Sequence, residues 1–301
     1  MNAIEVKELS KSYDGKEYAL EGISFSIPQG EIFGFLGPNG SGKTTTVRIL
    51  NGILSPSGGS ALVMNVDASK DPVKIHSFCG VMTETALAYE NLTGEENLHF
   101  FGSMHGLTKE EIRERSNRLL KSLELYEVKD KKVKSYSTGM KKRIQLARAL
   151  LHNPKVLFLD EPTSGLDPEA AMNVTQMIRN LSKENGVTVL LCTHQLKYAE
   201  EICTLYGFID KGKMLGFGTL FQLLSKKNSS IFLEIRGENI PNIDKLESKD
   251  GRTIRVPIKD DAEASALIQD IIAKGGKIYE ARQVRPNLED LYFEYQKEGT
   301  K

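Results

Sequence analysis

"GPNGSGKTT", residues 37–45, stands between a compact apolar run, "GEIFGFLG" (30–37), and a helical pattern, "TTVRILNGIL" (45–54). The spacing G-x-x-x-x-G-K-[ST] between a strand and a helix is typical of a phosphate-binding loop, whose backbone N–H groups turn toward phosphate oxygens at the helix N-terminus. Lys43 is expected to reach the β- and γ-phosphates, and Thr44 to offer its hydroxyl to Mg²⁺. The nucleotide-binding residues that this loop predicts are Gly37, Pro38, Asn39, Gly40, Ser41, Gly42, Lys43, Thr44 and Thr45.

Two later apolar runs end in residues that suit the same chemistry. "VLFLDE" (156–161) ends in Asp160 and Glu161, and "GVTVLLCTH" (186–194) ends in His194. An Asp at the carboxyl end of a buried strand is a Mg²⁺ ligand in phosphate-loop enzymes, and an adjacent Glu can polarise an attacking water as general base. His194 is predicted to hydrogen-bond the γ-phosphate. Kinases, GTPases and motor ATPases share this loop, so the loop alone does not identify the class of enzyme. The carboxylate pair narrows the possible classes.

Composition excludes some partners and some locations. The chain has 301 residues, with 40 Lys and Arg against 40 Asp and Glu, so its formal net charge is zero. This balance argues against a partner held mainly by bulk electrostatics, and we expect no nucleic-acid partner. The three cysteines form no C-x-x-C pair and are interpreted as buried or partly buried reduced thiols. We expect neither a signal peptide nor a membrane span, because the apolar runs are too short.

The order of the patterns predicts an α/β fold. Short apolar runs alternate with helical patterns up to about residue 216, which indicates a parallel sheet covered by helices, whereas the first 60 residues alternate as antiparallel strands do. Two capping boxes, at Thr93 and Thr108, begin helices in a helical subdomain of about 90–150. We therefore predict a phosphate-loop NTPase core with an antiparallel β subdomain and a helical subdomain. The predicted boundaries are a nucleotide-binding domain at 1–220, a linker at 221–230 and a small α+β domain at 231–301.

The stretch "YSTGMKKRIQLARAL" (136–150) poses a charge problem. It predicts a helix, and three cations, Lys141, Lys142 and Arg143, follow its start directly. A helix N-terminus carries partial positive charge and unpaired N–H groups, so cations there are unfavourable unless an anion docks against them.

From Ile4 to about Gly216, the sequence resembles the nucleotide-binding domain of ATP-binding cassette (ABC) transporters. "GPNGSGKTT" looks like the family's Walker A motif, "VLFLDEP" like Walker B and "SGLDP" (164–168) like the D-loop, while His194 falls at the switch histidine. "YSTGM" falls at the family's signature sequence, with Ser137 and Gly139 retained. The resemblance implies that Tyr13 stacks on adenine.

The departures from the family pattern carry information. Tyr136, Thr138 and Met140 replace the commoner Leu, Gly and Gln of the signature, and "YSTGMKKR" is similar to the variant found in a subclass of drug, antibiotic and sodium exporters. Glu84 stands where the family usually has a glutamine, and it is expected to hold Mg²⁺ or its water through an oxygen. The C-terminal unit resembles an accessory extension common behind such cassettes.

The resemblance also implies partners. It implies a head-to-tail dimer, either a homodimer or a heterodimer with a similar cassette, with two ATP molecules between the subunits. Ser137 and Gly139 would contact the ATP of the other subunit, and Asp167 would reach across toward it. An integral membrane permease would bind the segment 84–107, and the chain would be cytoplasmic, peripheral on the inner face of the cell membrane.

Two alternatives to an exporter ATPase stay open. One is a soluble ABC-type ATPase that acts on ribosomes or nucleic acid. Translation-factor relatives usually hold two cassettes in one chain, whereas the phosphate loop occurs once here. DNA-repair relatives carry long inserts, and the 94 positions between Lys43 and Ser137 leave no room for one. The other is a nucleotide-binding regulator without turnover, which the presence of Glu161 disfavours.

Overall fold

The chain divides into two compact units. The computed structural model describes residues 1–83, 88–226, 231–241, 247–248, 253–258, 260–284 and 286–299. Met1–Thr219 make up the first unit, and Leu220–Glu298 the second. The division falls after Thr219, one residue before the boundary expected from the sequence.

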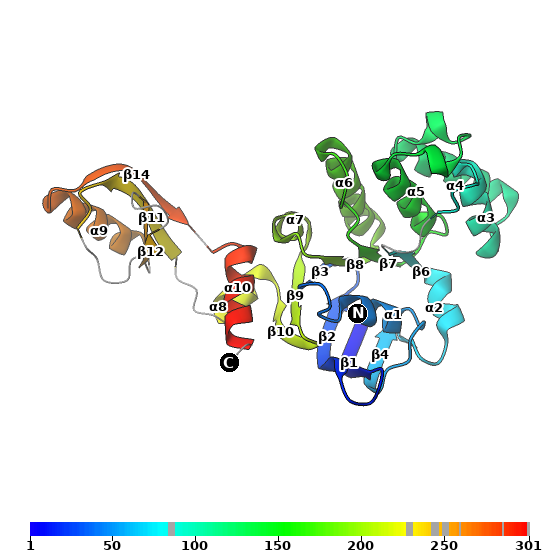
Figure 1. Cartoon of the computed structure of the whole chain (residues 1–301), viewed down its shortest axis with the longest axis horizontal. Helices are drawn as coiled ribbons and strands as arrows, with labels where there is room; N and C mark the ends of the chain where they lie inside the picture. The colour runs from blue at the N-terminus through cyan, green and yellow to red at the C-terminus, as the bar shows by residue number, and fades with distance from the viewer. Residues whose placement is uncertain are drawn as a thin grey trace. The chain divides into compact units, whose positions relative to one another are not determined.

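A six-stranded sheet forms the centre of the first unit (Figure 1). Neighbouring strands from β9 to β6 run parallel, and only the edge strand β10 is antiparallel. Every residue of β3 and β8 is buried, as the almost wholly apolar runs predict for strands covered on both faces. The strands, in sheet order, are β10 (Lys213–Gly218), β9 (Leu205–Asp210), β3 (Ile32–Leu36), β8 (Thr188–Thr193), β7 (Val156–Asp160) and β6 (Cys79–Met82).

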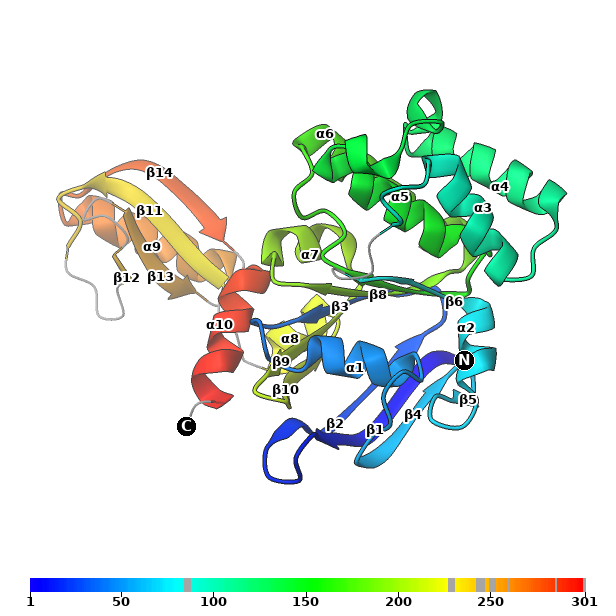
Figure 2. The same ribbon diagram turned by 45° about the vertical axis from the view of Figure 1, so that its right-hand side comes forward.

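A four-stranded sheet packs below the first one. Figures 1 and 2 show helix α1 (Lys43–Leu50) between the two sheets, and α5, α6 and α7 on the opposite face of the six-stranded sheet. The core between the sheets includes Val47 from α1 and the stacked rings of Phe25 and Phe33, whose centroids lie 5.3 Å apart. Pairing is antiparallel, as predicted for the first 60 residues, in the order β2 (Tyr18–Pro28), β1 (Asn2–Ser12), β4 (Gly58–Val63) and β5 (Val66–Asp67).

The predicted helical region contains three main helices. Both capping boxes are confirmed, since Thr93 and Thr108 each accept a hydrogen bond from the backbone N–H of the glutamate three residues later, and that glutamate bonds back. The helices of the first unit beyond α1 are α2 (Pro72–Phe78), α3 (Gly94–Met104), α4 (Lys109–Ser122), α5 (Thr138–Leu150), α6 (Pro168–Asn185) and α7 (Leu196–Ile202), with 3-10 turns η1 (Tyr126–Val128) and η2 (Val133–Ser135).

The second unit is an antiparallel sheet with helices. Its strands, in the order β12 (Glu247–Ser248), β13 (Thr253–Ile258), β11 (Ile231–Glu238) and β14 (Lys277–Val284), join the helices α8 (Leu220–Lys226), α9 (Asp261–Ala273) and α10 (Leu288–Gly299). Residues 221–226, assigned to a linker from the sequence, lie in α8, because Leu223 is fully buried and anchors this short helix. Residues 227–230 lie outside the described residues.

Two further sequence predictions concern cysteines and membrane spans. Cys79, Cys192 and Cys203 are free and buried, as predicted, and burial raises the pKa of each thiol. Among the described residues, no helix combines the length and the apolar character needed to cross a membrane.

Candidate functional site

The candidate site lies where three neighbouring strands end. β3, β8 and β7 are adjacent and parallel, so their carboxyl ends meet at one edge of the sheet. The glycine loop follows β3, Asp160 is the last residue of β7 with Glu161 directly after it, and His194 follows β8 directly. The fold thus brings together the three groups predicted from the sequence. The carboxylates and His194 lie about 120 and about 150 residues after the glycine loop in the chain.

The loop needs glycine for steric reasons. Gly42, the N-cap of α1, has φ 111°, a conformation that side chains rarely adopt. A Cβ on Gly37 would lie 2.1 Å from the carbonyl oxygen of Ile209 on β9, and one on Gly42 would lie 2.8 Å from that of Ala19. These glycines therefore let the loop pack directly on the neighbouring backbone, and Asn39 and Gly40 remain exposed at its tip.

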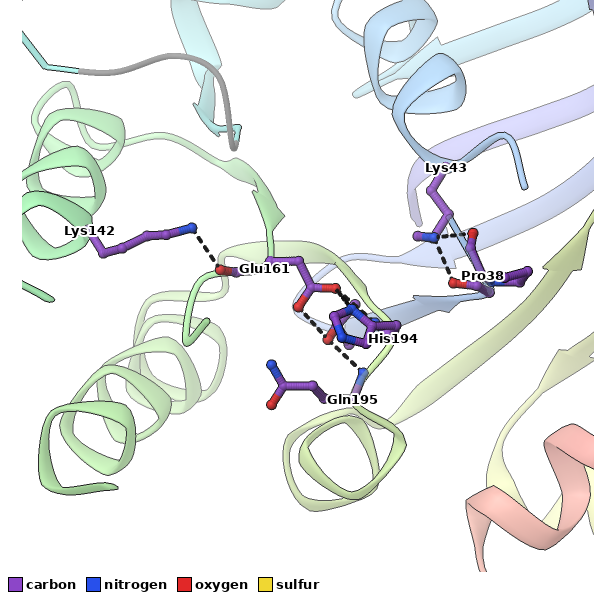
Figure 3. A network of polar contacts seen from close by, with 8 residues as sticks. Pro38, Lys43, Lys142, Glu161, His194 and Gln195 are labelled. Atoms are coloured by element: carbon purple, nitrogen blue, oxygen red, sulfur yellow. Dashed lines mark hydrogen bonds and ion pairs between the residues drawn. The ribbon is translucent and has the colours of Figure 1, made fainter. Parts of the chain in front are cut away.

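Lys43 points into its own loop. Its Nζ donates to the carbonyl oxygens of Gly37 at 2.7 Å and Pro38 at 2.9 Å (Figure 3). Burial lowers the pKa of this ammonium, and the negative charges of Asp160 and Glu161 partly oppose that shift. An ammonium carries three N–H donors, so these two bonds leave one for a phosphate oxygen.

Two hydroxyls complete the loop. The Ser41 hydroxyl is buried and has no hydrogen-bond partner among the described residues, which fits a loop built to meet a ligand's polar atoms. Thr44 lies exposed in the first turn of α1, so its hydroxyl is accessible to a cation. The residues present therefore suit a magnesium nucleotide.

Hydrogen bonds fix both the carboxylate and the backbone of Glu161. Its Oε1 accepts hydrogen bonds from the backbone N–H of His194 at 2.8 Å and faces His194 Nδ1 at 2.6 Å, while Oε2 accepts from Thr193 Oγ1 at 2.9 Å. Its backbone has φ 49°, in the left-handed region, which costs about 1–3 kcal/mol for a residue with a side chain. The peptide N–H donates to the carbonyl of Cys192 at 3.0 Å, which helps to hold that conformation.

This arrangement connects Glu161 and His194 directly. The imidazole of His194 is largely exposed, whereas the Glu161 side chain is 13% exposed. Thr193, which the sequence analysis missed, donates from its hydroxyl to the Glu161 carboxylate and accepts from the backbone N–H of Gln195. Its position immediately before His194 at the end of a buried strand is the signal that could have revealed it.

Tyr13 lies beside the start of α1. Its hydroxyl is 3.3 Å from Thr45 Oγ1, the residue is 62% exposed, and the ammonium of Lys11 lies 5.5 Å from the ring centroid. An exposed aromatic ring next to the phosphate loop provides a surface on which a base can stack.

The segment "YSTGM" (136–140), called the signature segment below, spans the start of α5. Ser137 is the N-cap of α5 and accepts a hydrogen bond from the N–H of Met140 at 3.2 Å. Ser137 and Thr138 are exposed, while Gly139 is half-buried against Leu166. Tyr136 is buried and its hydroxyl donates to a carbonyl at 2.8 Å, so this departure from the usual leucine serves packing.

The three cations that follow the start of α5 all have partners within the chain. Lys141 pairs with Glu90 at 2.5 Å, and Arg143 pairs with Glu124 at 3.0 Å. Lys142 donates to the backbone carbonyl of Glu161 at 3.2 Å. The anions that offset the charges at this helix start therefore include carboxylates of the same chain.

Asp167 and Glu84 are the remaining candidate residues. Asp167 is the N-cap of α6 and accepts from the N–H of Ala170 at 2.9 Å, a bond that lowers the pKa of the carboxyl group. In this chain its carboxylate caps its own helix. Glu84, the expected magnesium ligand, lies outside the described residues.

Comparison with known proteins agrees with this geometry. The family model described as ABC transporter matches residues 20–164. The chain is 33% identical to the uncharacterized ABC transporter ATP-binding protein YhcH of Bacillus subtilis (strain 168), over 97% of this chain and 95% of that protein. It is 36% identical to the daunorubicin/doxorubicin resistance ATP-binding protein DrrA of Streptomyces peucetius, over 88% of this chain and 79% of that protein.

One of the similar solved structures contains a bound nucleotide. The post-hydrolysis dimer of the ATP-binding cassette MJ0796 bound to ADP and Pi superposes with a TM-score of 0.67 at 27% identity, over 72% of this chain and 98% of that one. The predicted α/β phosphate-loop fold is confirmed by this match. With its phosphate loop, its strand-end carboxylates and these relatives, the chain belongs to the ABC transporter family and is an ATP-binding, ATP-hydrolysing subunit of a transporter.

Proposed function

We propose that the chain supplies the energy for an exporter by hydrolysing ATP on behalf of a separate membrane permease. The observation that carries the hydrolytic part is the Glu161 carboxylate, fixed by three contacts at the end of β7 beside the phosphate loop. The exporter part is supported by the similarity to a drug-resistance ATP-binding protein and by the variant signature "YSTGM".

Each residue of the site has a chemical role in this proposal. The loop from Gly37 to Thr45 and Tyr13 bind the nucleotide, and Lys43 neutralises phosphate charge. Glu161 accepts a proton from the attacking water, and His194, bonded to Glu161, stabilises the developing charge. Thr44, Asp160 and Glu84 are the proposed ligands of Mg²⁺, a cation that neutralises phosphate charge when bound.

The proposal includes a dimer. ABC ATP-binding subunits of transporters dimerise and work with membrane permeases. Here Ser137 and Gly139, at the exposed start of α5, would contact the nucleotide of the second subunit, and Asp167 would lie near it. The exposure of Ser137 and Thr138 supports this assignment, because this chain's own side chains leave the helix start accessible. The second subunit is either another copy or a similar cassette.

A groove between α2, α3 and α5 is the proposed permease contact. It encloses 510 Å³ and its lining includes Phe101, Met104 and the largely exposed Val73. Tyr89 stacks on Phe101 at its border, with ring centroids 5.7 Å apart. Leu98, which also lies in the segment 84–107, is fully buried and belongs to the core, so it does not line the proposed contact. A permease bound here would hold the chain at the cytoplasmic, inner face of the cell membrane.

Glu161→Gln tests the hydrolytic mechanism. The amide keeps the shape of the carboxylate and an oxygen acceptor for His194 N–H, so ATP binding should persist, whereas loss of the proton acceptor should cut hydrolysis by about 10²–10⁴-fold. Size-exclusion chromatography with ATP should then show a trapped dimer. Glu184→Gln, on the exposed end of α6, is the matched control. Hydrolysis at the parent rate by Glu161→Gln would contradict the general-base assignment.

The exporter assignment needs a separate test. A gene beside this one that encodes a six-span hydrophobic protein would identify the permease, and co-purification with it should stimulate hydrolysis. Failure of the two chains to associate would contradict the exporter assignment and would leave the proposed hydrolytic mechanism unaffected.

A further inference from the structure

Lys142 contacts the backbone of the proposed general base. Lys141 and Arg143 pair with acidic side chains, whereas Lys142 reaches from α5 to the backbone carbonyl of Glu161 at 3.2 Å (Figure 3). Charge neutralisation does not account for this contact, because the acceptor is an uncharged peptide group. Its result is that a side chain of α5 holds the peptide of the proposed general base.

The peptide that Lys142 holds is conformationally unusual. Glu161 has φ 49°, and its carbonyl also accepts from the N–H of Ser164 at 3.3 Å. A residue with a side chain stays in the left-handed region only where the surrounding structure imposes it. Movement of the Lys142 ammonium would therefore disturb the backbone from which the Glu161 carboxylate projects.

A second contact joins the same two segments. A Cβ on Gly139 would lie 3.3 Å from Leu166, and one on Gly165 would lie 3.4 Å from Thr138. The first turn of α5 thus packs against the segment 165–166, while Lys142, one turn further along, contacts residue 161. Ser137 and Lys142 are five positions apart on one rigid element, about 7.5 Å along the helix axis.

We propose that Lys142 is a positioning residue that couples the two nucleotide sites of a dimer. The inference rests on the proposed function, in which the start of α5 contacts the nucleotide of the second subunit. When that contact forms, α5 is fixed, and Lys142 transmits its position to the Glu161 peptide of the same chain. Nucleotide on one subunit thereby aligns the general base of the other.

The test compares Lys142→Met with Lys142→Gln in the full chain. Methionine keeps the length of the side chain and removes the donor, so we expect kcat to fall about tenfold or more, with the Hill coefficient for ATP falling toward one. ATP affinity of the monomer, measured with a fluorescent ATP analogue, should stay within about twofold, because Lys142 does not contact the phosphate loop. Glutamine restores an N–H donor and should recover at least half of the lost kcat.

Controls separate this coupling from general effects. Lys134→Met removes an exposed lysine three residues before the same helix start and should match the parent in kcat and Hill coefficient. Unchanged kcat and Hill coefficient in Lys142→Met, or an equal loss in Lys134→Met, would overturn the coupling role. So would a loss of monomer affinity as large as the loss of kcat, or absence of any recovery in a folded Lys142→Gln. A parent-like Glu161→Gln would instead overturn the proposed function itself.

Discussion

Ser137 has two proposed roles that one pair of substitutions can separate. Within its own chain, its hydroxyl caps α5 by accepting from the N–H of Met140 at 3.2 Å. Across the proposed dimer, the same exposed hydroxyl contacts the nucleotide of the second subunit. Ser137→Ala removes both interactions, whereas Ser137→Asp keeps a capping acceptor and changes only the charge presented to the partner.

The two variants should differ in stability. Loss of a serine N-cap costs about 1 kcal/mol, which for a unit of this size lowers Tm by about 2–4 °C in Ser137→Ala. The first turn of α5 contains no acidic residue, and Lys141 and Lys142 lie close by. An aspartate at the cap therefore meets both the positive end of the helix and nearby cations, so Ser137→Asp should melt at the parent temperature or above it.

The two variants should nevertheless both lose activity. Alanine removes one hydrogen bond to a charged phosphate, worth about 1.5–3 kcal/mol, so hydrolysis by the dimer should fall about 10- to 150-fold. Aspartate places a negative charge against the phosphate of the second subunit and should reduce hydrolysis further. ATP affinity of the monomer should not change in either variant, because Ser137 faces away from its own chain's nucleotide in the proposed arrangement.

Three measurements check this prediction. Differential scanning calorimetry without nucleotide gives Tm, equilibrium binding of a fluorescent ATP analogue to dilute protein gives monomer affinity, and phosphate release gives the hydrolysis rate. Ser135→Asp, two residues earlier, introduces the same charge near the helix without changing the cap. A stable Ser137→Asp that hydrolyses ATP at the parent rate would refute the contact across the dimer, and equal loss of monomer affinity would place Ser137 in its own chain's site.

Two further predictions follow from packing and from burial. Gly37→Ala would bring a Cβ to 2.1 Å from the Ile209 carbonyl, so the loop must shift; we expect ATP affinity to fall by about tenfold or more, and an unchanged affinity in equilibrium binding would contradict this. Burial, with a smaller contribution from His105, lowers the pKa of His152 from 6.5 to about 4, so the unfolded chain binds a proton that the folded chain excludes. The free energy of unfolding should therefore fall as the pH drops from 6.5 toward 4, by about 2 kcal/mol at pH 5 from this residue, and urea titrations of the parent and His152→Gln should show that difference; identical pH dependence in both would refute it.

The sequence predicted the parts of the site that short-range patterns encode. The loop from Gly37 to Thr45 and the carboxylates at 160–161 follow apolar runs whose burial on both faces is visible in composition alone, and parallel pairing then brings the strand ends together. The capping boxes at Thr93 and Thr108 are equally local, because the reciprocal bonds span only three residues.

The contacts that the sequence did not reveal are long-range. Lys142 meets Glu161 across 19 positions and Lys141 meets Glu90 across 51, and no periodicity records either pairing. The helix α8 was missed for a different reason, because the polar residues that follow it obscured one buried anchor, Leu223. Tertiary packing, which local patterns do not contain, determines these features.

The partners of Lys141, Lys142 and Arg143 determine which groups at the start of α5 are left to bind an anion. Lys141 and Arg143 are drawn toward Glu90 and Glu124, and Lys142 toward a peptide carbonyl, so all three side chains have acceptors in their own chain. The exposed start of the helix is then left with Ser137 and the first backbone N–H groups, which can hydrogen-bond a phosphate directionally. Three unpaired cations would attract any anion, whereas paired ones leave recognition to the geometry of the cap. The charges near the signature segment therefore serve the position of α5 within the chain more than direct attraction of the nucleotide.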